Sequence, residues 1–178
     1  MTNDALSPAE KAAREALEQM YVCIDEGKSF RFEAGAGAGK TYSLVEALKY
    51  LIDKKGVHLL RQNQQIACIS YTNVASNQIA SRIDRHPAIY SSTIHSFSWL
   101  LIKDFQTYLR EELPNIHDWW SEKLDEVGGI GCRKITYDEL GFRSIDDSHA
   151  SLHHNDVLAL TAKLMEHDKF RILLASRF

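Results

Sequence analysis

In the first thirty or so residues, apolar side chains first recur at the spacing of a helix and then alternate with polar ones as in a strand. Leu17, Met20, Tyr21 and Ile24 follow one another at helical spacing, and Gly27 is placed to end this helix. Ser7 can cap the helix, with Glu10 three residues later as the acid of a capping box. The apolar–polar alternation over residues 29–33 then predicts a short strand.

Strands and helices are expected to alternate through residue 113. Helical spacing predicts helices over residues 40–54, 73–85 and 95–113, with Gly56 ending the first of them. Short, mostly apolar runs over 65–72 and 88–94 predict buried strands. This order of elements is typical of an α/β domain with a mostly parallel sheet.

The alternation weakens after Pro114. A short helix is expected over 118–127, a break over 128–132 and a strand or hairpin over 133–146. A final helix, capped by Asn155 or Asp156, is expected to run to the last residue. We therefore predict an α/β core over 1–114, a small, mainly helical insertion over 115–150 and a helical return to the core over 151–178.

Composition limits the class of protein. The chain has 178 residues, 44% hydrophobic and 25% charged, which fits one folded domain. Its net charge of −3 excludes a broadly basic wrapper of nucleic acid but leaves room for a local basic patch. Three distant cysteines predict no disulfide framework, and we find no secretory signal or membrane-spanning run. We expect a cytoplasmic protein that has no membrane partner.

The stretch "AGAGAGKT" at residues 34–41 indicates phosphate binding. Glycines let backbone N–H groups approach a phosphate closely, and a following helix adds its dipole. Lys40 can reach the β- and γ-phosphates of a nucleotide, and the Thr41 hydroxyl can bind Mg²⁺. Ala34 stands where the usual pattern has glycine, and the alternative is a flexible loop with a chance lysine. The candidate nucleotide-binding residues are Ala34, Gly35, Ala36, Gly37, Ala38, Gly39, Lys40, Thr41 and Tyr42.

Four stretches together resemble the UvrD/Rep-like superfamily 1 DNA helicases. The glycine loop with alanine in first place is similar to the first motif of that family. The next motifs resemble "ISYTNVASNQIASRI" at 69–83 and "STIHSFSWLLI" at 92–102. The stretch "HHNDVLALTAKLMEHDKFRILLASRF" at 153–178 is similar to the helical segment before the family's Walker B strand.

The resemblance implies a RecA-like, three-layer P-loop domain that binds ATP, Mg²⁺ and single-stranded DNA. Lys40 and Thr41 would then be catalytic, with Thr41 on the metal. The implied DNA-binding residues are Tyr71, Thr72, Asn73, Thr93, His95 and Ser96. The residues alone leave two alternatives open: Tyr71 could pack at the end of a strand, and Asn73 could cap the next helix without binding DNA.

The acidic strand end that a P-loop ATPase needs is not among these residues. "YLID" at 50–53 and "LLIKD" at 100–104 each combine apolar residues with a final aspartate, but both lie in predicted helices. By the resemblance, the chain is the N-terminal part of an ATP-binding motor domain that stops before Walker B. We expect it to be inactive alone, with the rest of the motor or a repair or recombination protein as partner.

Two other functions compete with this interpretation. A P-loop kinase for a nucleotide or another small molecule would share the glycine loop, although no arginine-rich lid or acidic pair for an acceptor is found. A stand-alone, non-catalytic module that binds nucleotide or DNA is the third alternative.

Among the other residues, Trp99 is expected in the core and Trp119–Trp120 in packing of the insertion.

Overall fold

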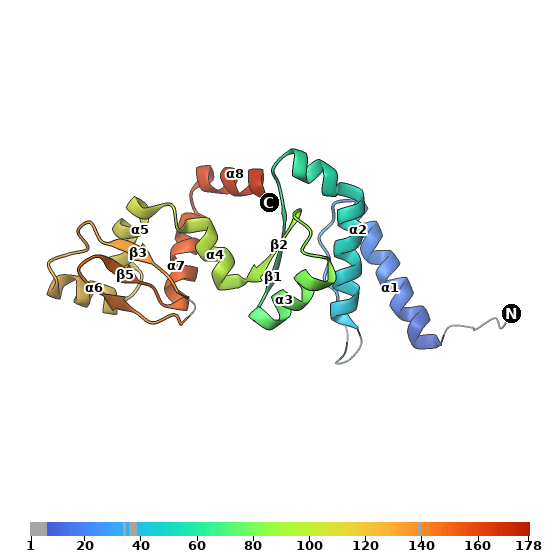
Figure 1. The fold of residues 1–178 in the computed structure, drawn as a ribbon, viewed down its shortest axis with the longest axis horizontal. Helices are drawn as coiled ribbons and strands as arrows, with labels where there is room; N and C mark the ends of the chain where they lie inside the picture. Colours follow the sequence, from blue (N-terminus) through green and yellow to red (C-terminus); the bar gives the residue numbers. More distant parts are fainter. Residues whose placement is uncertain (1–6, 34, 36–38, 139) are drawn as a thin grey trace. The chain divides into compact units, whose positions relative to one another are not determined.

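The chain folds into two compact units (Figure 1). The computed structural model describes residues 7–33, 35, 39–138 and 140–178. The first unit comprises the residues up to Ile66 together with Asn77–Ser91, and the second comprises Ala67–Ser76 together with Ser92–Phe178. This division differs from the one expected at residues 114 and 150.

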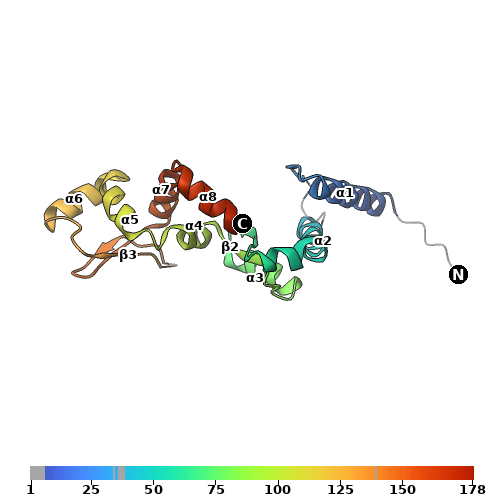
Figure 2. The same cartoon turned by 90° about the horizontal axis from the view of Figure 1, so that it is seen from above.

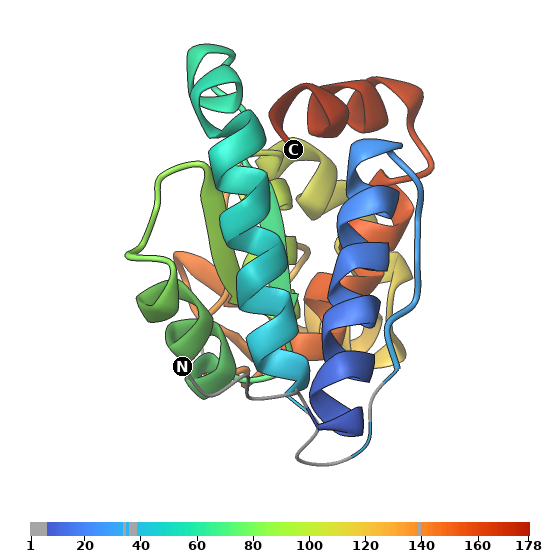
Figure 3. The ribbon, with the colours of Figure 1, turned by 90° about the vertical axis from the view of Figure 1, so that its right-hand side faces the viewer.

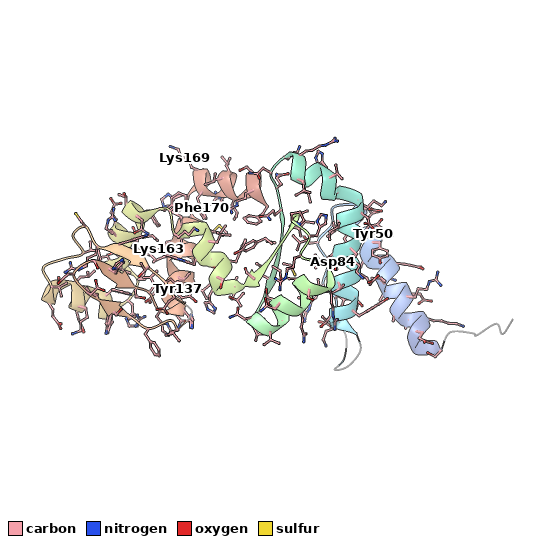
Figure 4. The ribbon with its side chains drawn as sticks, in the orientation of Figure 1. Tyr50, Asp84, Tyr137, Lys163, Lys169 and Phe170 are labelled. Carbon is pink, nitrogen blue, oxygen red and sulfur yellow. The ribbon has the colours of Figure 1, made fainter. Side chains whose placement is uncertain are left out.

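Two long helices form most of the first unit. α1 (Pro8–Asp25) begins as predicted, because Ser7 and Glu10 form both bonds of the capping box. α2 (Lys40–Arg61) runs beside α1 (Figure 3). Tyr50 joins them (Figure 4): its ring stacks on Tyr21 at a centroid distance of 4.2 Å, and its hydroxyl donates to Asp25 at 2.6 Å.

Two predictions for the first unit were wrong. Residues 29–33, expected as a strand, have no regular secondary structure. α2 does not end at Gly56 but continues to Arg61. Gly56 is buried, and a Cβ built on it would lie 3.3 Å from the His86 ring. The glycine therefore allows close packing inside the helix and is not its end signal.

A two-stranded sheet and a short helix follow α2 along the chain. β1 (Ile66–Ser70) and β2 (Ile89–Thr93) are neighbours in this sheet. α3 (Asn73–Arg82) lies between them in sequence and buries Ile79. The three elements fall within the ranges that apolar spacing predicted.

The second unit contains shorter helices than predicted. The helix expected over 95–113 is broken into α4 (Ile94–Ile102) and α5 (Gln106–Glu112), followed by a 3-10 turn, η1 (Leu113–Asn115). Phe105 at the break packs edge-on against Phe170, with ring centroids 5.4 Å apart. A tertiary contact that local spacing cannot reveal thus accompanies the break.

The final helix is also broken in two. α7 (His154–Leu164) and α8 (Asp168–Arg177) run in different directions (Figure 2). Arg171 donates to the backbone oxygens of Met165 and Glu166, just after the end of α7. His153, not Asn155 or Asp156, is the N-cap of α7.

The regular structure over residues 116–151 consists of a three-stranded sheet and α6 (Asp118–Glu126), among the residues that the structure describes. β5 (His149–Ser151) lies in the middle, parallel to β3 (Lys134–Thr136) and antiparallel to β4 (Ser144–Ile145). The segment expected to be mainly helical therefore contains a small mixed sheet as well as a helix. The side chain of Gln106 bonds both the N–H and the carbonyl of Ile135 and so covers part of β3.

One apolar core holds the second unit together. Trp120 is fully buried, and Trp99 packs against the same cluster, as predicted. The core joins α4 to α7 and both to the small sheet. Its members with no exposed surface include Ile102, Leu109, Leu113, Trp120, Ile135, Leu152, Val157 and Leu160.

Candidate nucleotide loop and nucleic-acid interface

The described part of the glycine loop leads directly into α2. Gly39 is the N-cap of that helix, with a φ of +78° that strongly favours glycine. The Lys40 ammonium donates to the Gly35 carbonyl at 3.0 Å and so lies across the loop. Thr41 and Tyr42 are exposed in the first turn of α2. Four further candidate residues lie outside the described part: Ala34, Ala36, Gly37 and Ala38.

An open hollow of about 520 Å³ adjoins this loop. Its lining includes Lys40 and Gly35, and also Phe32 and Glu33. The Glu33 carboxylate would repel a phosphate, but Arg31 pairs with it at 2.5 Å. The donor set of Lys40, backbone N–H groups and the Thr41 hydroxyl fits a nucleotide with its Mg²⁺.

A second hollow, of about 280 Å³, lies entirely within the second unit. It brings together five of the six residues predicted to bind DNA, from two stretches separated in sequence. Thr72 is the one that does not line it. The lining consists of Tyr71, Asn73, Thr93, His95, Ser96, Tyr137 and His154.

The start of α4 forms one wall of this hollow. Thr93 is the N-cap of α4, and its side-chain oxygen accepts from the backbone N–H of Ser96 at 3.3 Å. The Thr93 hydroxyl donates to the Ser96 hydroxyl at 3.0 Å. Because Ser96 accepts this bond, its own hydrogen is directed elsewhere. His95 completes the wall from the same helical turn.

The segment after β1 forms a second wall. Tyr71 is 94% exposed, so its ring does not pack at the end of the strand. Thr72 is the residue that caps α3, because its hydroxyl accepts from the backbone N–H of Ala75 at 3.2 Å. The expectation that Asn73 caps this helix was wrong: Asn73 is its first residue and lines the hollow.

Sequence reasoning missed Tyr137 and His154, which complete the lining. The Tyr137 hydroxyl lies 2.7 Å from Nδ1 of His154. The His154 ring lies 4.9 Å from that of His95, measured between centroids. Tyr137 lies outside the four stretches that resemble the helicase family, and His154 lies in the last of them, for which no DNA-binding role was predicted.

Burial and neighbouring charge affect His95. Burial lowers the pKa of His95, and positive charge on His154 and His153 lowers it further. The neutral ring is therefore favoured in the folded protein. A phosphate placed in the hollow would oppose both effects, because it stabilises the charged ring.

Asp156 fixes the start of α7 and thereby His154. Its carboxylate accepts from Arg143 at 2.6 and 2.8 Å and from Nε1 of Trp120 at 2.9 Å. It also accepts from the backbone N–H of His153, which completes a capping box. Burial acts to raise the pKa of Asp156, but the bonds from Arg143, Trp120 and His153 outweigh it and lower that pKa. The first turn of α7 is thus held by four hydrogen bonds.

Within the described ranges, no three His, Cys, Asp or Glu side chains lie together as a group that could hold a metal ion. None of the described helices is both long enough and apolar enough to cross a membrane.

Comparison with protein families identifies the family of this chain. The sequence profile described as UvrD/REP helicase N-terminal domain matches residues 14–173. The chain belongs to this family. The UvrD/REP family implies a P-loop α/β fold and, at the level of the family, ATP-dependent DNA helicase activity.

Individual relatives agree with this assignment. The chain is 41% identical to Gabija protein GajB of Bacillus cereus over 121 residues, which cover 67% of this chain and 17% of GajB. It is 33% identical to the ATP-dependent DNA helicase UvrD1 of Mycobacterium leprae over 85 residues, or 44% of this chain and 10% of UvrD1. UvrD1 of Mycobacterium tuberculosis is 30% identical over 103 residues, which cover 52% of this chain and 13% of that protein. The chain thus spans a small part of these relatives. No solved structure matches it.

Proposed function

We propose that this chain is the part of an ATP-dependent DNA helicase that binds ATP–Mg²⁺ and single-stranded DNA. The first unit would hold the nucleotide, and the second unit would hold the single-stranded DNA. The observation that carries the proposal is the second hollow. Five candidate residues from two separate motifs line one polar space, beside an exposed aromatic ring.

The hollow has the chemistry of a site for a nucleic-acid backbone. Asn73 opens α3, His95 and Ser96 lie in the first turn of α4, and His154 opens α7. The amino ends of helices favour anions, because their N–H groups and dipoles point toward them. Hydroxyl and amide side chains supply further donors for phosphate or sugar oxygens.

Tyr71 supplies the contact to a base. Its exposed ring offers a stacking platform next to the hollow, and stacking is tolerant of base identity. A single strand of DNA could therefore place a phosphate in the hollow and stack a base on the Tyr71 ring. This division of roles predicts binding that does not depend strongly on sequence.

The glycine loop would hold the nucleotide. Gly35, Gly39 and the loop residues between them would surround the phosphates, with Lys40 moving from the Gly35 carbonyl to the β- and γ-oxygens. Thr41 would bind the Mg²⁺, which neutralises phosphate charge when present. Because the two candidates for the acidic Walker B strand end, residues 50–53 and 100–104, lie within α2 and at the end of α4, we expect residues 1–178 to bind ATP and hydrolyse it slowly.

The DNA part of the proposal is tested with Tyr71→Ala. Loss of one stacked base should weaken binding of a fluorescein-labelled oligodeoxythymidylate of about 15 nucleotides by at least about fivefold. Fluorescence anisotropy at fixed salt gives the affinity. Ile172→Ala is the matched control, because it removes an exposed apolar side chain (70%) from α8 in the same unit. Equal affinity of wild type and Tyr71→Ala would refute the role of Tyr71.

The nucleotide part is tested with Lys40→Ala. We expect loss of fluorescent ATP-analogue binding with an unchanged far-ultraviolet circular dichroism spectrum. Lys49→Ala removes another exposed lysine of α2 and should bind normally. Phosphate release by the wild-type chain should stay near background, and rapid turnover would contradict the expected slow hydrolysis.

A further inference from the structure

We propose that Tyr137 and His154 form a third wall of the DNA site and contact the sugar–phosphate backbone of the strand. The inference rests on the proposed function, since it extends the same hollow. Neither residue belongs to the motifs that predicted the site, and both come from the part of the chain after residue 114.

Their position carries the proposal. Both side chains line the same hollow as Tyr71, Asn73 and the first turn of α4. Tyr137 follows β3, and Figure 4 marks its place in the second unit. His154 bridges toward the α4 wall, because its ring is 4.9 Å from the ring of His95. A ligand that bonds to His95 and Ser96 therefore lies within reach of His154 and Tyr137.

The two side chains are held in place before any ligand binds. The Tyr137 hydroxyl bonds to Nδ1 of His154, and its ring lies 6.0 Å from that of Trp99 at the edge of the core. Gly141 backs the His154 ring so closely that an added Cβ would lie 2.6 Å from it. A preorganised wall loses little side-chain entropy on binding, which favours a contribution to affinity.

The chemistry indicates contacts to the backbone and not to bases. The lining contains hydroxyl, amide and imidazole groups, and the described lining includes neither lysine nor arginine. Tyrosine hydroxyls and imidazole N–H groups donate to phosphate and sugar oxygens, and such contacts carry no sequence information. We therefore expect the wall to strengthen binding equally for different base compositions.

The test uses Tyr137→Phe and His154→Gln in the full chain. Each should weaken binding of the labelled oligodeoxythymidylate about fivefold, the effect of one neutral hydrogen bond. The loss should be the same for an oligodeoxyadenylate of equal length. Because the two side chains bond to each other, the double variant should lose less than the product of the single losses.

Matched controls separate binding from folding. Tyr108→Phe removes a hydroxyl from a tyrosine that packs on His167 in the same unit, and His149→Gln changes an exposed histidine of β5. Both should bind as wild type does. Urea unfolding of each variant, followed by tryptophan fluorescence, shows whether a loss of affinity merely follows a loss of stability.

Each outcome is decisive. Wild-type affinity in Tyr137→Phe and His154→Gln, together with weakened binding in Tyr71→Ala, would overturn this inference and leave the proposed function standing. An equal loss in Tyr108→Phe, or a loss that tracks the unfolding midpoint, would also overturn it. If the wild-type chain does not bind the oligonucleotide, the proposed DNA function and this inference both fail.

Discussion

Replacing Asp156 by asparagine should strongly destabilise the second unit. The carboxylate is buried, with its side chain 3% exposed, and its partner Arg143 is 19% exposed. Asparagine keeps the size of the side chain but removes the charge and turns one acceptor into a donor. The Arg143 guanidinium would then remain largely buried without a counter-charge.

The magnitude follows from this burial. Breaking a buried ion pair by removing one partner costs about 3–5 kcal/mol, and the partial exposure of Arg143 places this case near about 3 kcal/mol. With an m-value of about 1.5 kcal/mol per molar urea, the unfolding midpoint should fall by about 2 M. Asp168→Asn is the control, because its pair with Arg171 is exposed and should contribute less than about 1 kcal/mol.

Tryptophan fluorescence is a suitable assay because all three tryptophans lie in the second unit. Trp120 donates directly to Asp156, so its emission reports on the network itself. The pH dependence provides a second measurement. Since the folded pKa of Asp156 is below 3.8, its stabilisation is present above that value and is lost as pH falls through the folded pKa. A midpoint shift in Asp156→Asn no larger than that in Asp168→Asn would refute the reasoning.

Two other substitutions test the neighbourhood of the hollow. Gly141→Ala should destabilise the second unit by about 2 kcal/mol more than Gly128→Ala, because both glycines have positive φ but only Gly141 abuts the His154 ring. Equal urea midpoints for the two variants would contradict this. His95→Gln should abolish a pH-dependent component of the free energy of unfolding. Since the folded pKa of His95 lies below 6.5, the wild type loses stability relative to the variant as pH falls from about 7 to about 5. Parallel urea midpoints across that range would exclude it.

Short-range signals predicted the start of α1 and the places of three further elements. Ser7 and Glu10 define the start of α1, and apolar spacing located β1, α3 and β2. These features depend on side chains within a few residues of each other, which a sequence displays directly. Resemblance of motifs also indicated five residues that line the second hollow.

Several errors arose where a distant contact decides the local structure. A glycine such as Gly56 commonly marks the end of a helix, but here the His86 ring occupies the space that its missing side chain leaves. Phe105 breaks a continuous helical pattern and packs on Phe170, more than sixty residues later. Tyr137 follows β3 and His154 follows β5, and the pairing of these two strands places the two residues near each other. Local patterns contain no record of such contacts.

The interrupted course of the chain has a consequence for fragments of this protein. The second unit receives the segment with Tyr71 and Asn73, then the chain leaves at Ser76 and returns at Ser92. A polypeptide of residues 92–178 would carry most of the apolar core but not that wall of the hollow. Cleavage within 77–91 would leave both pieces present but no longer tethered. The wall would then behave as a separate ligand, and its occupancy would fall on dilution.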